Sequence, residues 1–234
     1  MGLGKIRVIA FDVFGTVVDW HGSITREIQS LGLPVEPGEF ASSWRSGYQP
    51  AMARVSSGEL GWTLIDDLHR MILDDVLAQF SIFNLDEDQK QHLNKVWHRL
   101  KPWDDSVEGL KLMKERHTIC TLSNGNLGLL SNMAKNAGLP WDCILSAEVF
   151  RKYKPDPDVY LGVCQVFDVN SEETMLVAAH QSDLDAARAC GLQTAYVERR
   201  DEFGKNSPKD VSSNNNNTFH ARDFIDLANQ LDQL

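Results

Sequence analysis

The spacing of apolar residues divides the chain into three stretches. Between Ile6 and Phe11 the run is nearly unbroken and rich in β-branched residues, which predicts a short, buried strand. Residues 20–103 instead repeat apolar positions every three or four residues, the period of a helix with one buried face. Asp86 with Gln89 three residues later is typical of a helix N-terminal cap. The helices expected there are Gly22–Leu31, Glu39–Val55, Trp62–Phe80 and Asp86–Leu100.

From Ser106 onwards, short apolar runs alternate with helical patterns. Strands are expected at Thr118–Leu122, Cys143–Ser146, Thr174–Ala179 and Thr194–Val197, and helices at Val107–Glu115, from Leu127, at Pro157–Phe167 and at Ser182–Ala189. Because helices between strands imply parallel order with right-handed crossovers, the fold class is α/β with a doubly wound parallel sheet. Residues 1–19 and 104–234 would form this core domain, and residues 20–103 a helical cap inserted after the first strand. The polar residues 206–217 predict a disordered loop, and residues 219–234 return to helical spacing.

Composition limits the partners and the compartment. The formal net charge is −10 and no run of Lys and Arg stands out, so we expect no nucleic-acid partner. No apolar stretch is long enough for a signal peptide or a membrane span, which favours a cytoplasmic protein without a membrane partner.

Polar residues follow the ends of several predicted strands. Asp12 comes directly after the first strand, Ser123 and Asn124 after the second, and His180 close to the end of a later one. In an open parallel sheet the ligand crevice lies outside these carboxyl ends, so Asp12 is the first candidate for a reactive group. Lys154 precedes a predicted helix; on its own it would be taken for a solvated surface lysine. His180 has a similar alternative as a capping or core histidine.

The segment from Asp12 to Thr16 resembles the first motif of the haloacid dehalogenase superfamily, an Asp nucleophile followed by Gly and Thr. Asp12, Gly15 and Thr16 match that motif. The phosphatases of the superfamily carry a second Asp where this chain has Phe14. An aromatic ring cannot protonate a leaving group or help to bind magnesium, so Phe14 favours the (S)-2-haloacid dehalogenase branch. The resemblance implies a Rossmann-like core with a helical cap, no metal, no cofactor, and a homodimer through the cap.

Three further segments resemble motifs of the same branch. Ser123 and Asn124 match the second, and Lys154 with Tyr160 the third, in the pattern Lys-Pro-x-Pro-x-x-Tyr. The fourth reads Ala-Ala-His-Gln-Ser-Asp from residue 178 and resembles a subgroup with His180 where better-known relatives have Asn. A neutral imidazole with a pKa near ~6.5 would be a competent base for activating water at neutral pH. Asp183 would orient that water.

In the predicted cap, Arg45 stands at the spacing of the arginine that polarises the departing halide in the dehalogenases. Phe14, Trp44 and Tyr48 would supply apolar walls around the halogen. Ser123, together with backbone N–H groups that follow Asp12, such as that of Val13, would hold the substrate carboxylate. The remaining substrate-binding candidates are Asn124 and Tyr160.

The resemblance implies hydrolysis of short (S)-2-haloalkanoic acids to (R)-2-hydroxy acids through an ester on Asp12. Lys154 and Thr16 would position Asp12, and His180, with Asp183, would deliver water to the ester. Two alternatives stay open: a magnesium-dependent phosphatase that uses Asp12 as nucleophile and Asp183 as metal ligand, and an inactive binding module that keeps the fold. The natural substrate and the halogen preference, fluoride included, are not determined by these motifs.

Overall fold

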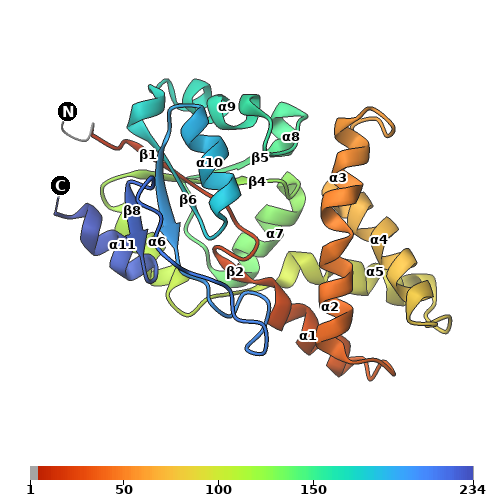
Figure 1. Ribbon diagram of the computed structural model, residues 1–234. Coiled ribbons are helices and arrows are strands. Elements are labelled where there is room, and N and C mark those ends of the chain that lie inside the picture. Colours follow the sequence, from red (N-terminus) through yellow and green to blue (C-terminus); the bar gives the residue numbers. More distant parts are fainter. Residues whose placement is uncertain (1–4, 234) are drawn as a thin grey trace.

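The computed structural model describes residues 5–233 and contains a six-stranded parallel sheet with helices on both faces (Figure 1). The strand order is β5-β4-β1-β6-β7-β8, so β1 lies in the middle, flanked by β4 and β6. The strands are β1 (Val8–Phe11), β4 (Thr118–Ser123), β5 (Cys143–Ser146), β6 (Thr174–Ala178), β7 (Gln193–Val197) and β8 (Phe219–Ala221). The predicted α/β class is confirmed.

The central strand β1 is buried on both faces. One face packs against α6, α7 and α11, where Phe11 meets the ring of Phe224 at 5.4 Å. The other face packs against α9 and α10, where Val8 and Ala10 share a cluster with Tyr160. The helices of the core are α6 (Ser106–Lys114), α7 (Leu127–Ala137), α8 (Ala147–Phe150), α9 (Pro157–Phe167), α10 (Gln181–Ala189), α11 (Phe224–Leu231) and the 3₁₀ turn η2 (Ser171–Glu173).

A helical insertion follows β2 and lies to one side of the sheet (Figure 1). It comprises α1 (Trp20–Ser30), α2 (Pro37–Ser46), α3 (Tyr48–Ser56), α4 (Ile65–Gln79), α5 (Glu87–Asn94) and the 3₁₀ helix η1 (Lys95–Arg99). The short strands β2 (Val18–Asp19) and β3 (Lys101–Pro102) pair antiparallel where the chain leaves and re-enters the core. The large buried side chains of the insertion belong to the same apolar cluster as the α6, α7 and α11 face, so the insertion is packed against the core rather than tethered to it.

Some predicted elements differ from the observed ones. The single helix expected at Glu39–Val55 is two helices separated at Gly47, where an added Cβ would lie 2.4 Å from Ile72 of α4. The helix expected at Asp86–Leu100 ends at Asn94 and continues as 3₁₀, although its predicted cap by Asp86 and Gln89 is confirmed as a capping box. The strands β2, β3 and β8 were not predicted, because two or three residues are too few to show a period.

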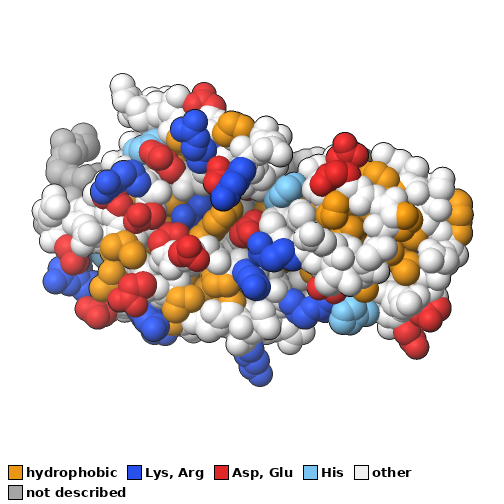
Figure 2. Space-filling view, turned by 90° about the horizontal axis from the view of Figure 1, so that it is seen from below, with side chains coloured by type: hydrophobic (Ala, Val, Ile, Leu, Met, Phe, Trp, Pro, Cys, Tyr) orange, Lys and Arg blue, Asp and Glu red, His pale blue; other side chains and the backbone are white. Residues whose placement is uncertain are grey.

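On the face drawn in Figure 2, Lys and Arg side chains are interspersed with Asp and Glu, so this face carries no extended field of one sign. None of the helices within residues 5–233 combines the length and the apolar character that a membrane crossing requires.

Gly109 lets α6 pack closely against α11. A Cβ at this position would lie 2.3 Å from the Cβ of Phe224, so Gly109→Ala must push the helices apart. We expect the free energy of unfolding to fall by about 1–3 kcal/mol, the usual cost of overpacking. Gly128→Ala in α7 is the matched control, since its Cβ would meet nothing nearer than 3.8 Å and alanine favours helices by up to ~1 kcal/mol. Urea unfolding measures both; equal stability of the two variants would contradict the packing argument.

Candidate active site

Asp12 follows β1 at the carboxyl edge of the sheet. Its backbone N–H extends the ladder by donating to the carbonyl oxygen of Val177 on β6 (3.0 Å). The residue is 7% exposed, and the Thr16 hydroxyl donates to its Oδ2 at 2.7 Å. That hydroxyl also accepts from the backbone N–H of Ala179 (2.9 Å), which ties the loop after β1 to the end of β6. The strand pairing and the loop together fix the orientation of the Asp12 carboxylate.

Lys154 lies between two carboxylates. Its Nζ is 3.0 Å from Oδ1 of Asp12 and 2.5 Å from Oδ2 of Asp183, while the Tyr160 hydroxyl donates to the other Asp183 oxygen at 2.6 Å. Burial opposes ionisation of Asp12, but the Lys154 charge and the hydrogen bond from His180 outweigh it and hold the pKa of Asp12 well below its usual range. Burial also opposes the charge of Lys154, yet Asp12 and Asp183 raise its pKa above the usual value. Asp12 is therefore an anion and Lys154 a cation at neutral pH.

Asn124 links the loop after β4 to the loop that carries Lys154. Its Oδ1 accepts from the backbone N–H of Lys154 at 2.8 Å, and its Nδ2 donates to the sulfur of Met52 on α3 at 3.2 Å. One buried amide thus holds the lysine loop and contacts the helical insertion at the same time.

His180 precedes α10 and lies between two carboxylates from different parts of the chain. Its Nδ1 is 3.1 Å from Oδ2 of Asp12, and its Nε2 is 2.8 Å from Oε1 of Glu202. Burial alone would lower the pKa of His180, but the hydrogen bonds and charges of both carboxylates outweigh it and raise the pKa to about 9. The raised pKa favours a protonated ring in the free protein, whereas the sequence led us to expect a neutral imidazole when His180 activates water.

Glu202, in the loop after β7, was not found from the sequence. It is 1% exposed, and its carboxylate contacts Nζ of Lys209 at 2.6 Å in addition to His180. Burial would raise the pKa of Glu202, but these two cations outweigh burial and lower it to about 2. Gly15, with φ +84°, makes room for this side chain, since a Cβ there would lie 2.2 Å from Glu202 Oε1. Lys209 was assigned to a disordered loop; in the structure it also donates to the carbonyl oxygen of Ala179.

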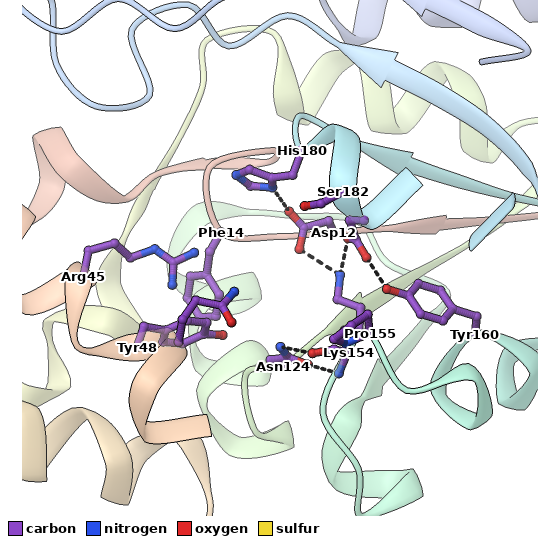
Figure 3. Close-up of a pocket in the computed structure, with 12 residues that line it drawn as sticks. Asp12, Phe14, Arg45, Tyr48, Asn124, Lys154, Pro155, Tyr160, His180 and Ser182 are labelled. Carbon is purple, nitrogen blue, oxygen red and sulfur yellow. Dashed lines mark hydrogen bonds and ion pairs between the residues drawn. The ribbon is translucent and has the colours of Figure 1, made fainter. Parts of the chain in front are cut away.

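A cavity of about 330 Å³ lies at the carboxyl edge of the sheet, beside Asp12, Lys154 and His180 (Figure 3). Arg45 and Tyr48 reach it from α2 and α3 of the insertion, and the guanidinium carbon of Arg45 lies 4.0 Å from the centre of the Tyr48 ring. Phe14 supplies part of the apolar wall. The cavity is lined by Asp12, Phe14, Arg45, Tyr48, Gln49, Asn124, Lys154, Pro155, Tyr160, His180, Ser182 and Asp183.

A family model described as haloacid dehalogenase-like hydrolase matches residues 6–191, most of the chain. The chain belongs to this family. Within the family it falls in the L-2-haloacid dehalogenase branch. The structure of the defluorinating L-2-haloacid dehalogenase Rha0230 is 43% identical, with a TM-score of 0.92 over 97% of this chain and 95% of that one. The L-2-haloacid dehalogenase PA0810 is 41% identical, with a TM-score of 0.93 over 99% of this chain and all of that one.

A curated relative agrees with this placement. (S)-2-haloacid dehalogenase 1 of Pseudomonas sp. (strain CBS-3) is 29% identical over 203 residues, which cover 84% of this chain and 86% of the relative. The likeness therefore extends over the sheet and the helical insertion alike.

Some candidates of this haloacid dehalogenase-like chain do not line the cavity. The hydroxyl of Ser123 is buried and accepts from the backbone N–H of Gly125 at 3.1 Å, while Thr16 and Val13 lie in the packed wall behind Asp12. Trp44, expected beside the halogen, is fully buried in the insertion, where its Nε1 donates to the carbonyl of His69 (2.9 Å). Tyr48, the other aromatic residue expected from this segment, does line the cavity, from the start of α3.

The residues that would hold magnesium in a phosphatase of this family do not fit a divalent ion here. Asp12 and Asp183 are the two carboxylates concerned, and the Lys154 ammonium already occupies the space between them. Phe14, which lines the cavity, offers no oxygen ligand. A cation at this position would have to displace Lys154 from both ion pairs.

Proposed function

We propose that this chain hydrolyses short (S)-2-haloalkanoic acids to (R)-2-hydroxy acids and halide, with Asp12 as nucleophile and without metal or cofactor. The observation that carries the proposal is the Asp12 carboxylate, kept ionised by Lys154 at the wall of a cavity that it shares with Arg45 and Phe14. The names of the similar proteins reported above support the same substrate class. Rha0230 is described as defluorinating, so we include fluoride among the leaving groups to be tested.

In the first step, an oxygen of Asp12 attacks C2 of the substrate from the side opposite the halogen. The C–halogen bond breaks, its electron pair leaves with the halide, and the configuration at C2 inverts. Arg45, which reaches the cavity from the insertion, is placed to stabilise the departing anion, and Phe14 and Tyr48 exclude water from it. Ser123, Asn124 and the backbone N–H of Val13 are the proposed holders of the substrate carboxylate; of these, Asn124 lines the cavity.

In the second step, water attacks the Asp12 carbonyl carbon and transfers a proton to a base. His180 suits this role better than Asp183, because both oxygens of Asp183 are already occupied by Lys154 and Tyr160. Lys154 contacts Oδ1 of Asp12 and Thr16 donates to Oδ2, so the oxygen that does not carry the ester has one of these two donors to stabilise its charge in the tetrahedral intermediate. Collapse then breaks the ester bond and the proton passes from His180 to the departing alkoxide. The second proton of the water, left on the Asp12 carboxyl, passes to His180 Nδ1, so Asp12 is restored as an anion and the inverted C2 is unchanged.

Halide release from the two enantiomers of 2-chloropropionate tests this function. We expect the (S) enantiomer alone to release chloride, at an unchanged rate when EDTA is present. Parallel reactions contain (S)-2-fluoropropionate and a panel of phosphate esters with magnesium. Phosphate release without halide release would replace the proposal by a phosphatase, and turnover of neither class would favour a binding module.

The remaining proposals concern the domains of the chain, its oligomeric state and its location in the cell. We propose that residues 20–103 act as a cap over a core of residues 1–19 and 104–234, with Arg45 as the contribution of the cap to the site. A homodimer through the cap and a cytoplasmic location are proposals that come from the family resemblance.

A further inference from the structure

We propose that Glu202 and Lys209 are positioning residues which set the tautomer and the proton affinity of His180 for hydrolysis of the ester on Asp12. This inference rests on the proposed function. It assigns a role to the loop after β7, which lies outside the segments that resemble family motifs. Neither residue lines the cavity, so both act through His180 rather than on the substrate.

The contacts of His180 determine which nitrogen can act as the base. Both ring nitrogens face carboxylate oxygens in the free protein, Nδ1 toward Asp12 and Nε2 toward Glu202, so both carry protons. Formation of the ester removes the negative charge of Asp12 but not that of Glu202. The proton on Nε2 is then still held by a carboxylate, whereas the proton on Nδ1 has lost its anionic partner. His180 consequently loses its proton from Nδ1, the nitrogen on the side of the Asp12 carboxyl group.

The charges around His180 differ between the free protein and the ester intermediate. Asp12 faces the ring from the end of β1 and Glu202 from the loop after β7; Lys154 lies behind Asp12 and Lys209 behind Glu202. In the free protein the two carboxylates raise the pKa of His180 to about 9. After ester formation only Glu202 remains, so the pKa falls and a neutral imidazole becomes available at the stage that needs a base. Protonated His180 in the resting site and a basic His180 in the intermediate are therefore compatible.

The positive charge of Lys209 offsets part of the negative charge of Glu202 and so limits how far Glu202 raises the pKa of His180. Its ammonium contacts Oε2 of Glu202 at 2.6 Å and also the carbonyl oxygen of Ala179, the residue before His180. The second bond fixes the backbone from which the imidazole projects. Trp20 donates weakly to Glu202 Oε1 at 3.3 Å, the oxygen that also faces His180 Nε2. Glu202 is thus held from several sides in a packed site that leaves it 1% exposed.

Two substitutions are expected to move the pH dependence of ester hydrolysis in opposite directions. Glu202→Gln keeps the shape but removes the anion, so the pKa of His180 in the intermediate falls and the midpoint of the rate moves to lower pH by about one to three units. Without the anion to fix the proton on Nε2, the plateau rate should also drop, by roughly tenfold. Lys209→Met leaves the Glu202 charge unbalanced, so the midpoint moves to higher pH by roughly one unit or less. Lys205→Met, exposed in the same loop, is the control and should keep the wild-type midpoint.

Quenched-flow mass spectrometry of the protein during one turnover of (S)-2-chloropropionate measures the decay of the Asp12 ester at each pH. Chloride release in the same samples reports the first step and shows that each variant is folded and competent. Opposite midpoint shifts with complete chloride bursts support the inference. Midpoints that shift together, or stay with that of Lys205→Met, overturn it while leaving the proposed function standing. Absence of an ester in the wild-type protein overturns both.

The resting site offers a second, turnover-independent measurement. NMR titration of the His180 ring in the free protein should give a lower pKa in Glu202→Gln and a higher one in Lys209→Met than in the wild type. If the loop had only a structural role, the two substitutions would not shift the pKa of His180 in opposite directions.

Discussion

Asp12→Asn is expected to abolish halide release, to less than ~10⁻⁴ of the wild-type rate, since loss of a nucleophile removes the covalent route entirely. Asparagine fills the same space and still accepts from Thr16, so the fold should persist. His180→Gln is expected to behave differently. It should release one equivalent of halide and then stop at the ester, with steady-state turnover reduced by roughly 10²–10⁴-fold. Halide electrodes and intact-protein mass spectra distinguish the two variants.

Isotope labelling shows whether the hydroxyl oxygen of the product comes from Asp12 or directly from water. In a single turnover in ¹⁸O water the wild-type protein should incorporate solvent oxygen into Asp12, and the first hydroxy acid released should carry the unlabelled oxygen of that carboxylate. Label that enters the product directly, and not the protein, would mean that water attacks C2 and that Asp12 is not the nucleophile.

Lys154→Met is expected to cause the second large loss of activity, together with a loss of stability. The ammonium is the link between Asp12 and Asp183, and its removal leaves two buried carboxylates without their shared cation. We expect halide release to slow by about 10²–10³-fold, the usual effect of deleting one stabilising donor from an active site. The free energy of unfolding at neutral pH should fall by about 3 kcal/mol, because breaking a buried ion pair leaves charge unpaired.

The pH dependence of this stability loss follows from Asp12. Its folded-state pKa is depressed, so its ion pair contributes stability above the ordinary carboxyl pKa, and this contribution is lost as the pH falls. The difference between Lys154→Met and wild type should therefore be largest near neutral pH and shrink in acid. Lys152→Met is the control, as Lys152 is exposed and pairs with surface carboxylates, and it should change stability by no more than ~0.5 kcal/mol. Urea unfolding from pH 3 to pH 7 measures the free energy of unfolding of each variant relative to wild type. If this difference were the same for both lysine variants and did not change with pH, the stabilising role of the Lys154–Asp12 ion pair would be contradicted.

The order of elements and much of the cavity could be predicted because the informative residues lie at strand ends. Asp12, Asn124 and His180 each follow an apolar run, and parallel strands bring their carboxyl ends to one edge. Arg45 was found only because it stands at the position of an arginine in the family that the chain resembles. The helical period by itself shows which face of a helix is buried, but not which other segment that face packs against. The break at Gly47 had no periodic signal, because α2 and α3 have similar apolar spacing.

Glu202 and Lys209 lay beyond sequence analysis for a different reason. Both occur in a charged, turn-rich segment that ordinarily forms a solvated loop. Glu202 contacts His180, the partner of Asp12, and is separated from Asp12 by 190 positions in the chain. Only the packing of the loop against Gly15 and Ala179 buries the Glu202 carboxylate beside His180. The charge state of His180 depends on the same contacts.

The sequence by itself determined the α/β alternation, the helical insertion and the presence of Asp12, Asn124 and His180 at one edge of the sheet, because these follow from local periodicity and from residue types at strand ends. The tertiary structure decided how those side chains are charged and which of them face the cavity. Ionisation depends on the distances to Asp12, Lys154 and Glu202 and on exclusion of water. Those quantities arise only when segments distant in the chain are packed together.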